Sequence, residues 1–398
     1  MYMTNFIFIS PNFPENYWQF CRELKNNGLN VLGIGDEQYD NLTDDLKGSL
    51  TEYYKVNSLE NYDEVYRAVA FFTFKYGKID WLESNNEYWL ERDASLRTAY
   101  NIFSGFQVWD MDYIKYKSKM KPFYEAAGIP TARYYLVDSY EGAWKFINEV
   151  GFPVITKPDN GVGASDTHKI KDEKDLNRFF ATKIPNVRYI MEEYIEGEVD
   201  SYDAIIDSHG NPIFETGTCS PVSIMDIVND ADDPLYHVTA EIPDNLREAG
   251  RATVKVFDVR NRFVHFEFFR LTCDQHIGKE GDIVALEVNM RPCGGDTPTM
   301  MNYANSTNVY KIYADMIAFD STMLSTGEKG YCASAGRWDH KNYLMSNDDL
   351  YAKYSDHIRV AERVPDAIAS TTGNYTYLAV FDTEEEMFAF YEDVVRTY

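Results

Sequence analysis

The chain contains few cysteines, and none of them are paired at the spacing of a metal site. Among 398 residues there are five, at Cys21, Cys219, Cys273, Cys293 and Cys332. No two form a Cys-x-x-Cys pair, and no histidines follow at a matching distance. This pattern argues against a cysteine-based zinc site and against a disulfide framework. We therefore expect reduced thiols, as in a cytoplasmic protein.

Positive charge is also scarce. The sequence has 38 Lys and Arg against 64 Asp and Glu, which gives a net charge of −26. A protein that binds nucleic acid needs a cationic face for the phosphate backbone, so we expect no nucleic-acid partner. A site for an anionic nucleotide in such a chain would have to build positive potential locally, from individual lysines and arginines.

Long apolar segments are lacking as well. A bilayer-spanning helix needs about 20 consecutive apolar residues, and the sequence has no such run. The first residues, MYMTNFIFISPNFPENYWQF, lack the positively charged start of a signal peptide. We therefore expect no membrane association and a cytoplasmic location.

The length and the order of apolar segments predict two or three domains. Strands are expected at residues 6–10, 30–35 and 79–83, and helices at 15–25, 64–76 and 89–100. This alternation favours a parallel sheet with helices on both faces. The first strand–helix turn, SPNFPEN, is not the glycine-rich dinucleotide fingerprint, so a dinucleotide-binding domain is a weak interpretation.

The pattern changes after about Asp112. A helix is expected at 115–127, and it is followed by short antiparallel strands at 132–137, 153–157, 189–193, 201–207, 263–271 and 283–289. A strand at 375–381 and a helix from Glu384 end the chain. The prediction is therefore an α/β domain (1–113), an α+β domain (114–320) and a small C-terminal α+β lobe (321–398). Residues 219–241 are predicted as a long loop over the site.

Two lysines and a glycine-containing turn are candidates for phosphate binding. Lys117 begins the predicted helix 11 positions before Gly128, although its lysine-rich surroundings equally suit a solvated surface. Lys157 ends a strand, and Gly161, Gly163 and Ser165 follow it at once. Backbone N–H groups in such a turn can approach a phosphate while the lysine adds a point charge.

The segment YIMEEYIEGEVDSYDAII is a candidate hinge for a nucleotide base. A strand ends in Glu192, Glu193 and Ile195, and Glu198 opens the next strand. Backbone groups here could meet an adenine edge, and a carboxylate could meet ribose hydroxyls. Adjacent glutamates are, however, more often simply surface charge.

The most informative pattern combines HFEFF with ALEVNMRP. Glu287, Asn289 and Arg291 alternate along one strand and so face the same side, while Glu267 lies on the preceding strand. Oxygen ligands of this kind suit Mg²⁺ held against phosphates. Arg291 would then stabilise negative charge on a transferring phosphoryl group. Alternation places His265 on the face of Glu267 and Arg270 on the opposite face.

These motifs, in this order, resemble the ATP-grasp superfamily between about Lys115 and Pro292. The similarity is to its carboxylate–amine ligase branch, which includes biotin carboxylase, the carbamoyl phosphate synthase large chain and D-alanine–D-alanine ligase. The resemblance implies an α/β N-terminal domain, an α+β ATP-grasp fold with two lobes around the nucleotide, and a small C-terminal lobe. It also implies that the N-terminal domain helps to form the substrate site.

The resemblance assigns a role to each candidate residue. It makes Lys117 and Lys157 the phosphate-binding lysines, and Gly161, Gly163 and Ser165 part of a phosphate-covering loop. Adenine would lie at Glu192, Glu193 and Ile195, with ribose near Glu198. At the hinge the family often has lysine where this chain has Glu193. The metal ligands would be Glu267, Glu287 and Asn289, and the catalytic residues Arg291 and Lys157.

The function that the resemblance implies is an ATP-dependent ligase. It would phosphorylate a carboxylate to an acyl phosphate and couple this to an amine, using ATP and Mg²⁺, with Mn²⁺ as an alternative ion. An amino acid or small peptide is the expected substrate, and a homodimer the expected assembly. Two alternatives stay open: phosphoryl transfer to a carboxylate without amide formation, and a nucleotide-binding regulatory subunit.

Overall fold

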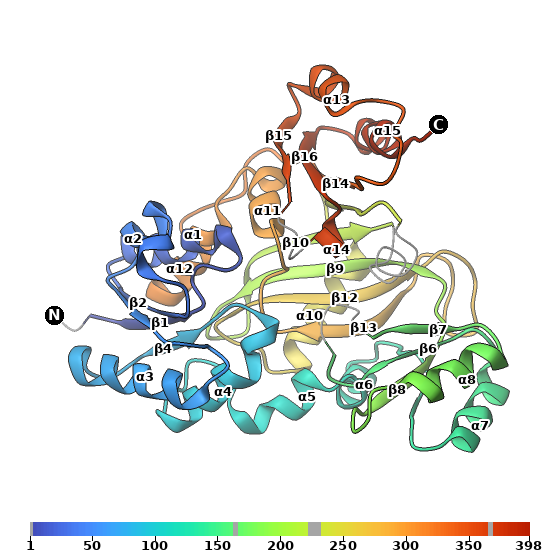
Figure 1. Cartoon of the computed structure of the whole chain (residues 1–398), viewed down its shortest axis with the longest axis horizontal. Coiled ribbons are helices and arrows are strands. Elements are labelled where there is room, and N and C mark those ends of the chain that lie inside the picture. The colour runs from blue at the N-terminus through green and yellow to red at the C-terminus, as the bar shows by residue number, and fades with distance from the viewer. Residues whose placement is uncertain (1–2, 162–165, 222–231, 365–368) are drawn as a thin grey trace.

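The computed structural model describes residues 3–161, 166–221, 232–364 and 369–398 (Figure 1). Its strands form three sheets, two of four strands and one of eight. None of the helices within these ranges combines the length and apolarity that crossing a membrane requires.

The first sheet is parallel and has the order β3-β2-β1-β4. Its strands are β1 (Asn5–Ile9), β2 (Asn30–Gly35), β3 (Glu52–Lys55) and β4 (Trp81–Glu83). Its helical segments are η1 (Glu15–Tyr17), α1 (Trp18–Asn26), η2 (Tyr39–Asn41), α2 (Asp44–Ser49), α3 (Tyr62–Tyr76), η3 (Glu87–Trp89), α4 (Leu90–Ala99) and η4 (Val108–Asp110).

Alternate residues of β1 explain why helices cover both faces of this sheet. Phe6 and Phe8 pack in the same core as residues of α1, whereas Ile7 and Ile9 pack with residues of α3 and α4. The predicted α/β arrangement is therefore confirmed, with β3 and α2 as additions. These two elements are hard to predict from the sequence, because β3 has only four residues and is half-buried, and α2 has only six residues.

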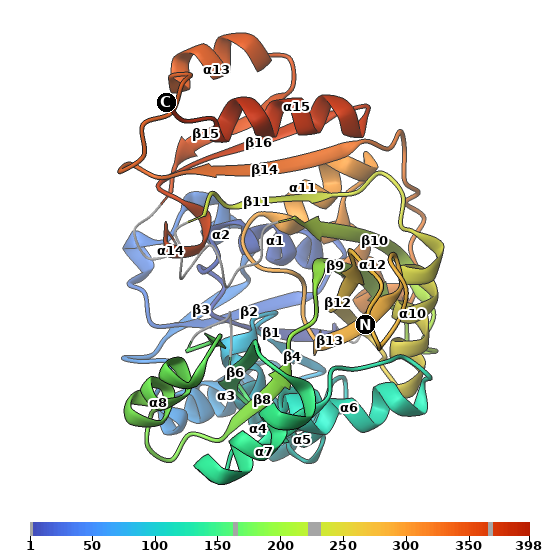
Figure 2. The same ribbon diagram turned by 90° about the vertical axis from the view of Figure 1, so that its right-hand side faces the viewer.

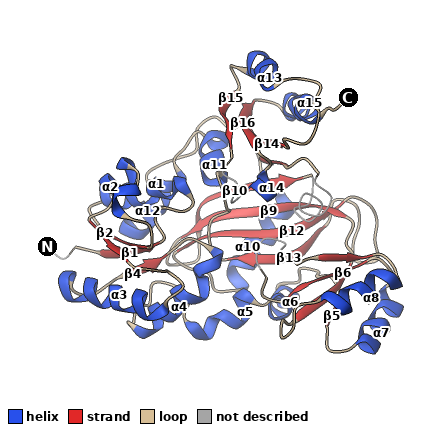
Figure 3. Cartoon of the chain, in the orientation of Figure 1, coloured by secondary structure: helices blue, strands red, loops and turns tan. Residues whose placement is uncertain are grey.

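The large sheet has the order β13-β12-β9-β10-β11-β14-β16-β15, and all of its strand pairs are antiparallel (Figure 3). The first five strands along the chain are β9 (Gly197–Ile206), β10 (Pro212–Ser220), β11 (Leu235–Val238), β12 (Arg262–Leu271) and β13 (Ile283–Asn289). The remaining strands are β14 (Tyr331–Arg337), β15 (Ile358–Arg363) and β16 (Tyr375–Phe381). The strands of residues 321–398 thus extend the sheet of the central region (Figure 2).

One sequence expectation is wrong at β11. Residues 219–241 do not form a loop throughout, because β10 continues to Ser220 and Leu235–Val238 form a strand between β10 and β14. The four residues Leu-Tyr-His-Val suit a strand that is partly buried between two neighbours. Residues 222–231 lie outside the described ranges.

The third sheet has the order β5-β8-β6-β7 and forms a separate lobe beside the large sheet (Figure 1). Its strands are β5 (Tyr134–Leu136), β6 (Val154–Pro158), β7 (His168–Ile170) and β8 (Tyr189–Glu193), and two helices, α7 (Tyr140–Val150) and α8 (Glu173–Thr182), complete its core. The other helices are α5 (Met111–Lys115), α6 (Lys117–Ala126), α10 (Asp244–Val256), α11 (Thr297–Asn305), α12 (Val309–Phe319), α13 (Asn347–Tyr354), α14 (Ala369–Thr372) and α15 (Glu384–Val395).

The helix predicted at 115–127 is α6, which begins two residues later than predicted because Lys115 ends the preceding helix α5. Tyr116 has an extended backbone, and α6 begins at Lys117. The buried Asp159 holds this start, because its carbonyl accepts from the Lys117 N–H at 2.8 Å and its carboxylate accepts from the Ser118 N–H at 2.8 Å. A residue some forty positions away therefore sets the orientation of α6, which local sequence patterns cannot indicate.

Candidate active site

One face of the large sheet carries two rows of polar side chains. In the strand register His265 lies opposite both Asp203 and Asn289, and Glu267 lies opposite Ser201 and Glu287. Because side chains alternate between the faces of a sheet, both rows point to the same side. On the other face Phe266 and Val288 belong to the core formed with α6 and α10. The predicted metal ligands Glu267, Glu287 and Asn289 are thus brought together.

Helix α6 connects this polar face to the small lobe. The Lys117 Nζ lies 2.9 Å from Glu287 Oε2 and donates to the Gly161 carbonyl at 2.9 Å. One turn further on, the Lys121 Nζ lies 2.5 Å from Glu192 Oε1 on β8. Residues four apart share a helix face, so these two lysines reach the two sides of the same cleft.

Lys157 also binds Glu192, at 2.8 Å from its Oε2. Burial opposes ionisation of this carboxyl, but Lys121 and Lys157 outweigh that effect and lower the pKa of Glu192 from 4.5 to about 2. The carboxylate of Glu192 is therefore directed at two lysines. The Glu192 backbone lies between β5 and β6, opposite Tyr134 and Ile155.

The remaining hinge candidates point elsewhere. The Glu193 carboxylate accepts from the Arg133 backbone and side chain at 2.7 and 2.8 Å, and His276 lies 3.3 Å away. Ile195 is buried in a small apolar cluster with Ala132, Leu271 and Val284.

The structure does not bring Glu198 to the polar face. In the register Glu198 is opposite Arg270, on the side of β9 that also carries Asp200 and Tyr202. Burial and the nearby Asp200 raise the pKa of Glu198. Strand alternation counted from Ser201 and Asp203 would have given this placement from the sequence.

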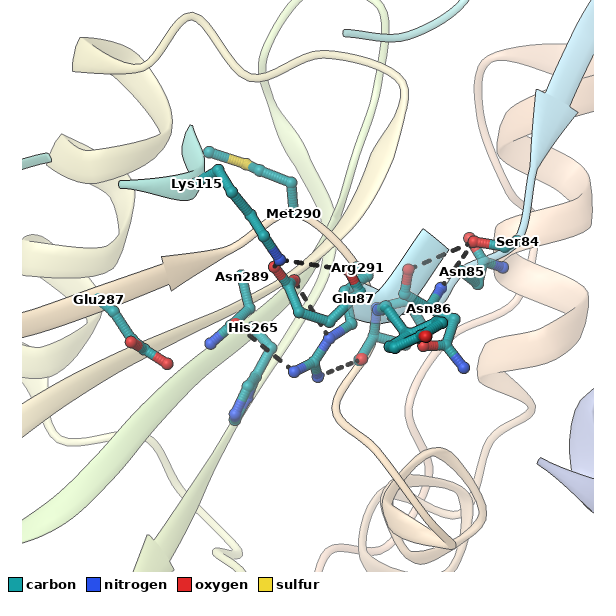
Figure 4. A network of polar contacts seen from close by, with 12 residues as sticks. Ser84, Asn85, Asn86, Glu87, Lys115, His265, Glu287, Asn289, Met290 and Arg291 are labelled. Atoms are coloured by element: carbon teal, nitrogen blue, oxygen red, sulfur yellow. Dashed lines mark hydrogen bonds and ion pairs between the residues drawn. The ribbon is translucent and has the colours of Figure 1, made fainter. Parts of the chain in front are cut away.

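Arg291 meets a carboxylate from the N-terminal domain. Its Nε lies 3.6 Å from Glu87 Oε2, and its Nη2 lies 3.4 Å from the Asn289 Oδ1 (Figure 4). Glu87 also accepts from the Lys115 Nζ at 2.7 Å. Burial disfavours the charge on Arg291, but Glu87 and neighbouring groups outweigh it and raise the pKa of the guanidinium. Figure 4 shows Glu87 between Lys115 and Arg291, beside the polar face of the large sheet.

Sequence reasoning did not identify Glu87, Lys115 or Lys121 as site residues. Lys121 could have been found from its four-residue spacing to Lys117. No sequence pattern pointed to Glu87, because it lies in a 3₁₀ turn of the N-terminal region and approaches the site only through the tertiary structure. Of the predicted phosphate loop, Gly161 lies beside Lys117, while Gly163 and Ser165 lie outside the described residues.

These groups line a small polar cleft. Its lining residues are Glu87, Lys115, Lys117, Met120, Gly161, Glu287, Val288 and Asn289. Its charged lining residues are two lysines and two glutamates, and Lys157 and Arg291 lie close enough to help lower the pKa of Glu287. In a chain with a net charge of −26, a cleft in which cations balance the carboxylates is a local exception, and its lysines suit a polyphosphate that takes the place of their carboxylate partners.

The oxygen donors of the cleft fit a magnesium ion. Glu267 and Glu287 offer carboxylates from directly opposed strand positions, and Asn289 offers its amide oxygen. Burial opposes the charge on Glu287, but Lys117 and Lys157 lower its pKa from 4.5 to about 2, so it is ionised at neutral pH. Among the described residues the buried Asn289 Nδ2 has no hydrogen-bond partner, while its Oδ1 accepts a long hydrogen bond from Arg291, at 3.4 Å. Two carboxylates and an amide oxygen are hard ligands of the kind that Mg²⁺ prefers.

No protein-family model matches the chain. Among solved structures, L-amino acid ligase from Bacillus licheniformis is 13% identical with a TM-score of 0.71, and the match covers 99% of this chain and 97% of that one. N5-carboxyaminoimidazole ribonucleotide synthetase from Thermotoga maritima is 16% identical with a TM-score of 0.67, covering 99% of both chains.

A third similar structure is the biotin carboxylase domain of 2-oxoglutarate carboxylase from Hydrogenobacter thermophilus, a dimer in complex with MgADP, ADP and bicarbonate. It is 15% identical with a TM-score of 0.69, and the match covers 96% of this chain and 87% of that one. Since these likenesses extend over nearly the whole chain, the protein has the ATP-grasp fold that these enzymes share.

Proposed function

We propose that the protein is an ATP-dependent ligase that activates a carboxylate as an acyl phosphate and joins it to an amine. One observation carries the proposal: α6 places Lys117 against Glu287 of the large sheet and Lys121 against Glu192 of the small lobe. Cations and magnesium-type ligands therefore face one another across a single cleft between the two lobes. The similar structures include an L-amino acid ligase and a biotin carboxylase domain in complex with MgADP, which supports an ATP-dependent ligase reaction.

In the proposed site Lys117 and Lys157 bind the phosphates, together with Gly161, Gly163 and Ser165, of which only Gly161 lies within the described residues. The backbone at Glu192–Ile195 holds the adenine edge. Glu267, Glu287 and Asn289 hold Mg²⁺, or Mn²⁺ in its place, which would neutralise phosphate charge when bound. Glu198 is not included, because its strand position faces away from the other groups.

The chemistry requires positioning and charge stabilisation more than a protein nucleophile. A substrate carboxylate oxygen forms a bond to the γ-phosphorus as the bond to ADP breaks. Arg291 stabilises the negative charge that develops during this transfer. An amine then attacks the acyl carbon, phosphate leaves, and the amine loses a proton to complete the amide. Exclusion of water from the cleft prevents hydrolysis of the activated carboxylate.

We propose an amino acid or a small peptide as a substrate. Arg291 already has a carboxylate, that of Glu87, 3.6 Å from its Nε. A substrate carboxylate would take the place of Glu87 against this guanidinium, because the fork of N–H donors matches that group. The similarity to an L-amino acid ligase supports this substrate class. A homodimer is part of the proposal, since one of the similar structures is a dimer.

Phosphate release from Mg·ATP tests the proposal, measured with amino acids, dipeptides and small carboxylates, singly and in pairs. We expect release that depends on both a carboxylate and an amine and that is lost in Glu287→Ala. Glu215→Gln is the matched control, because Glu215 pairs with Arg251 at 2.8 Å, away from the cleft. Release that needs no amine would favour phosphoryl transfer alone. ATP binding without any release would favour a regulatory subunit, and absence of ATP binding would refute the proposal.

A further inference from the structure

A mixed set of nitrogen, oxygen and sulfur donors lies beside the proposed magnesium ligands. Asp203 on β9, His265 on β12 and Cys293 after β13 each offer one ligand atom, and these atoms lie within 4.8 Å of one another. Asp203 and His265 are buried, and Cys293 is a partly buried free thiol. Three segments of the chain therefore converge on one point with three different donor types.

The orientation of His265 is fixed by carboxylates on both sides of its ring. Its Nδ1 lies 2.9 Å from Asp203 Oδ1, and its Nε2 lies 3.0 Å from Glu267 Oε1. Asp203 is itself held, because the Ser201 hydroxyl donates to its other oxygen and Ser201 bonds Thr218 at 2.6 Å. With Asp203 as a ligand on the Nδ1 side, Glu267 on Nε2 is the kind of outer hydrogen-bond partner that commonly orients a histidine ligand.

This donor set differs in chemistry from the proposed magnesium site. Glu267, Glu287 and Asn289 offer only oxygen, which suits Mg²⁺. A thiolate, an imidazole and a carboxylate instead suit a borderline-soft ion such as Zn²⁺, which commonly takes four ligands. Glu267 contacts the opposite ring nitrogen, Nε2, so it would accept a hydrogen bond from the ring, and solvent would supply the fourth ligand.

We propose that Asp203, His265 and Cys293 form a second cation site that binds a zinc-class divalent ion and competes with the magnesium site for Glu267. An ion bound to the Nδ1 of His265 would leave Nε2–H as a donor, which would hold the Glu267 carboxylate, 3.0 Å away, toward His265 and away from Glu287, its directly opposed neighbour on β13. Zinc would then weaken Mg²⁺-dependent nucleotide binding. The coupling rests on the proposed function, whereas zinc binding itself does not.

Zinc content is the first measurement. The full chain is treated with a chelator and then dialysed against Zn²⁺ in the presence of excess Mg²⁺. The molar ratio of bound zinc to protein is measured by inductively coupled plasma mass spectrometry. We expect one zinc per chain, with at least a tenfold weaker affinity in Cys293→Ser. Cys219→Ser is the matched control, because Cys219 is also a partly buried thiol beside a carboxylate, with Glu198 Oε2 4.0 Å away. Co²⁺ in place of Zn²⁺ should give a thiolate-to-cobalt absorption band that Cys293→Ser lacks.

Absence of bound zinc, or zinc that is unaffected by Cys293→Ser, would overturn the site. Nucleotide binding then tests the coupling: calorimetry with Mg·ADP should show weaker binding in the presence of Zn²⁺ for the wild-type chain and no change for Cys293→Ser. Zinc bound through Cys293 with unchanged nucleotide affinity would overturn the coupling alone. If Mg·ADP fails to bind without zinc, the proposed function and the coupling both fail, and the zinc count stands as a separate result.

Discussion

Replacing Glu192 by glutamine tests whether this residue balances the charge of two lysines or contacts the nucleotide base directly. Glu192 is 6% exposed and holds Lys121 and Lys157, and its pKa is lowered from 4.5 to about 2. That change in pKa corresponds to about 3 kcal/mol of preference for the charged carboxylate in the folded protein. Glu192→Gln keeps the shape but leaves two buried lysines without a counter-charge. We therefore expect the free energy of unfolding at pH 7 to fall by about 3 kcal/mol.

The same change should increase the stabilisation by nucleotide. Phosphates that bind Lys157 would supply the missing negative charge, so Mg·ATP should raise the unfolding free energy of Glu192→Gln by more than it raises that of the wild type. Urea unfolding with and without Mg·ATP measures both quantities. Glu193→Gln is the matched control, because the partner of Glu193, Arg133, is 41% exposed, and the expected cost is about 1 kcal/mol or less. Weaker stabilisation of Glu192→Gln by nucleotide would refute the reasoning and point to direct contact between Glu192 and the base.

Three further predictions concern other parts of the molecule. Arg291→Lys keeps the charge but loses the guanidinium fork, and we expect kcat for phosphate release to fall by about 10²–10³-fold with little change in KM for ATP; an unchanged kcat would exclude a catalytic role. Burial lowers the pKa of His237 from 6.5 to about 4. As the pH falls, this histidine is therefore protonated in the unfolded state before it is protonated in the folded state, and the free energy of unfolding decreases between pH 6.5 and pH 4. Between pH 7 and pH 5 this loss is about 2 kcal/mol, and urea unfolding should show that His237→Phe lacks it; equal pH dependence of the two proteins would contradict the assignment. Glu83 lies between the buried Arg97 and Arg262, at 3.0 and 2.5 Å, so Glu83→Gln should cost about 3–5 kcal/mol in urea unfolding, and a cost below about 1 kcal/mol would show that the arginines find other partners.

Much of the fold follows from local sequence patterns. The strands Asn30–Gly35, Tyr189–Glu193, Ile283–Asn289 and Tyr375–Phe381 agree residue for residue with the prediction, because each is an apolar or alternating run with clear ends. The break at Tyr116 was missed, since the cap of α6 comes from Asp159, in a different part of the chain. The strand β11 was missed because it is short and needs two neighbours to form its hydrogen bonds.

The same distinction holds for the candidate site: the strand positions of its residues could be predicted from the sequence, but their interaction partners could not. Strand alternation placed Glu287 and Asn289 on one face, and Glu267 follows from the register of β12 with β13, whereas Arg291, which was expected on the same strand, lies beyond its end at Asn289. The partners of these groups depend on tertiary structure. The alternation in the sequence could not show that Glu87 reaches Arg291 from another domain, because no periodic pattern relates residues of different domains.

The two contacts of α6 also limit how this segment can change in length. Lys117 and Lys121 are four residues apart, about 6 Å along the axis, and they bind Glu287 of the large sheet and Glu192 of the small lobe. A single residue inserted between them would rotate one lysine by about 100° relative to the other, so only one contact could be kept. An insertion after Ala126, where α6 has ended, leaves both lysines in phase. A substitution at the exposed Lys119 is therefore compatible with the site, whereas an insertion or deletion between Lys117 and Lys121 is not.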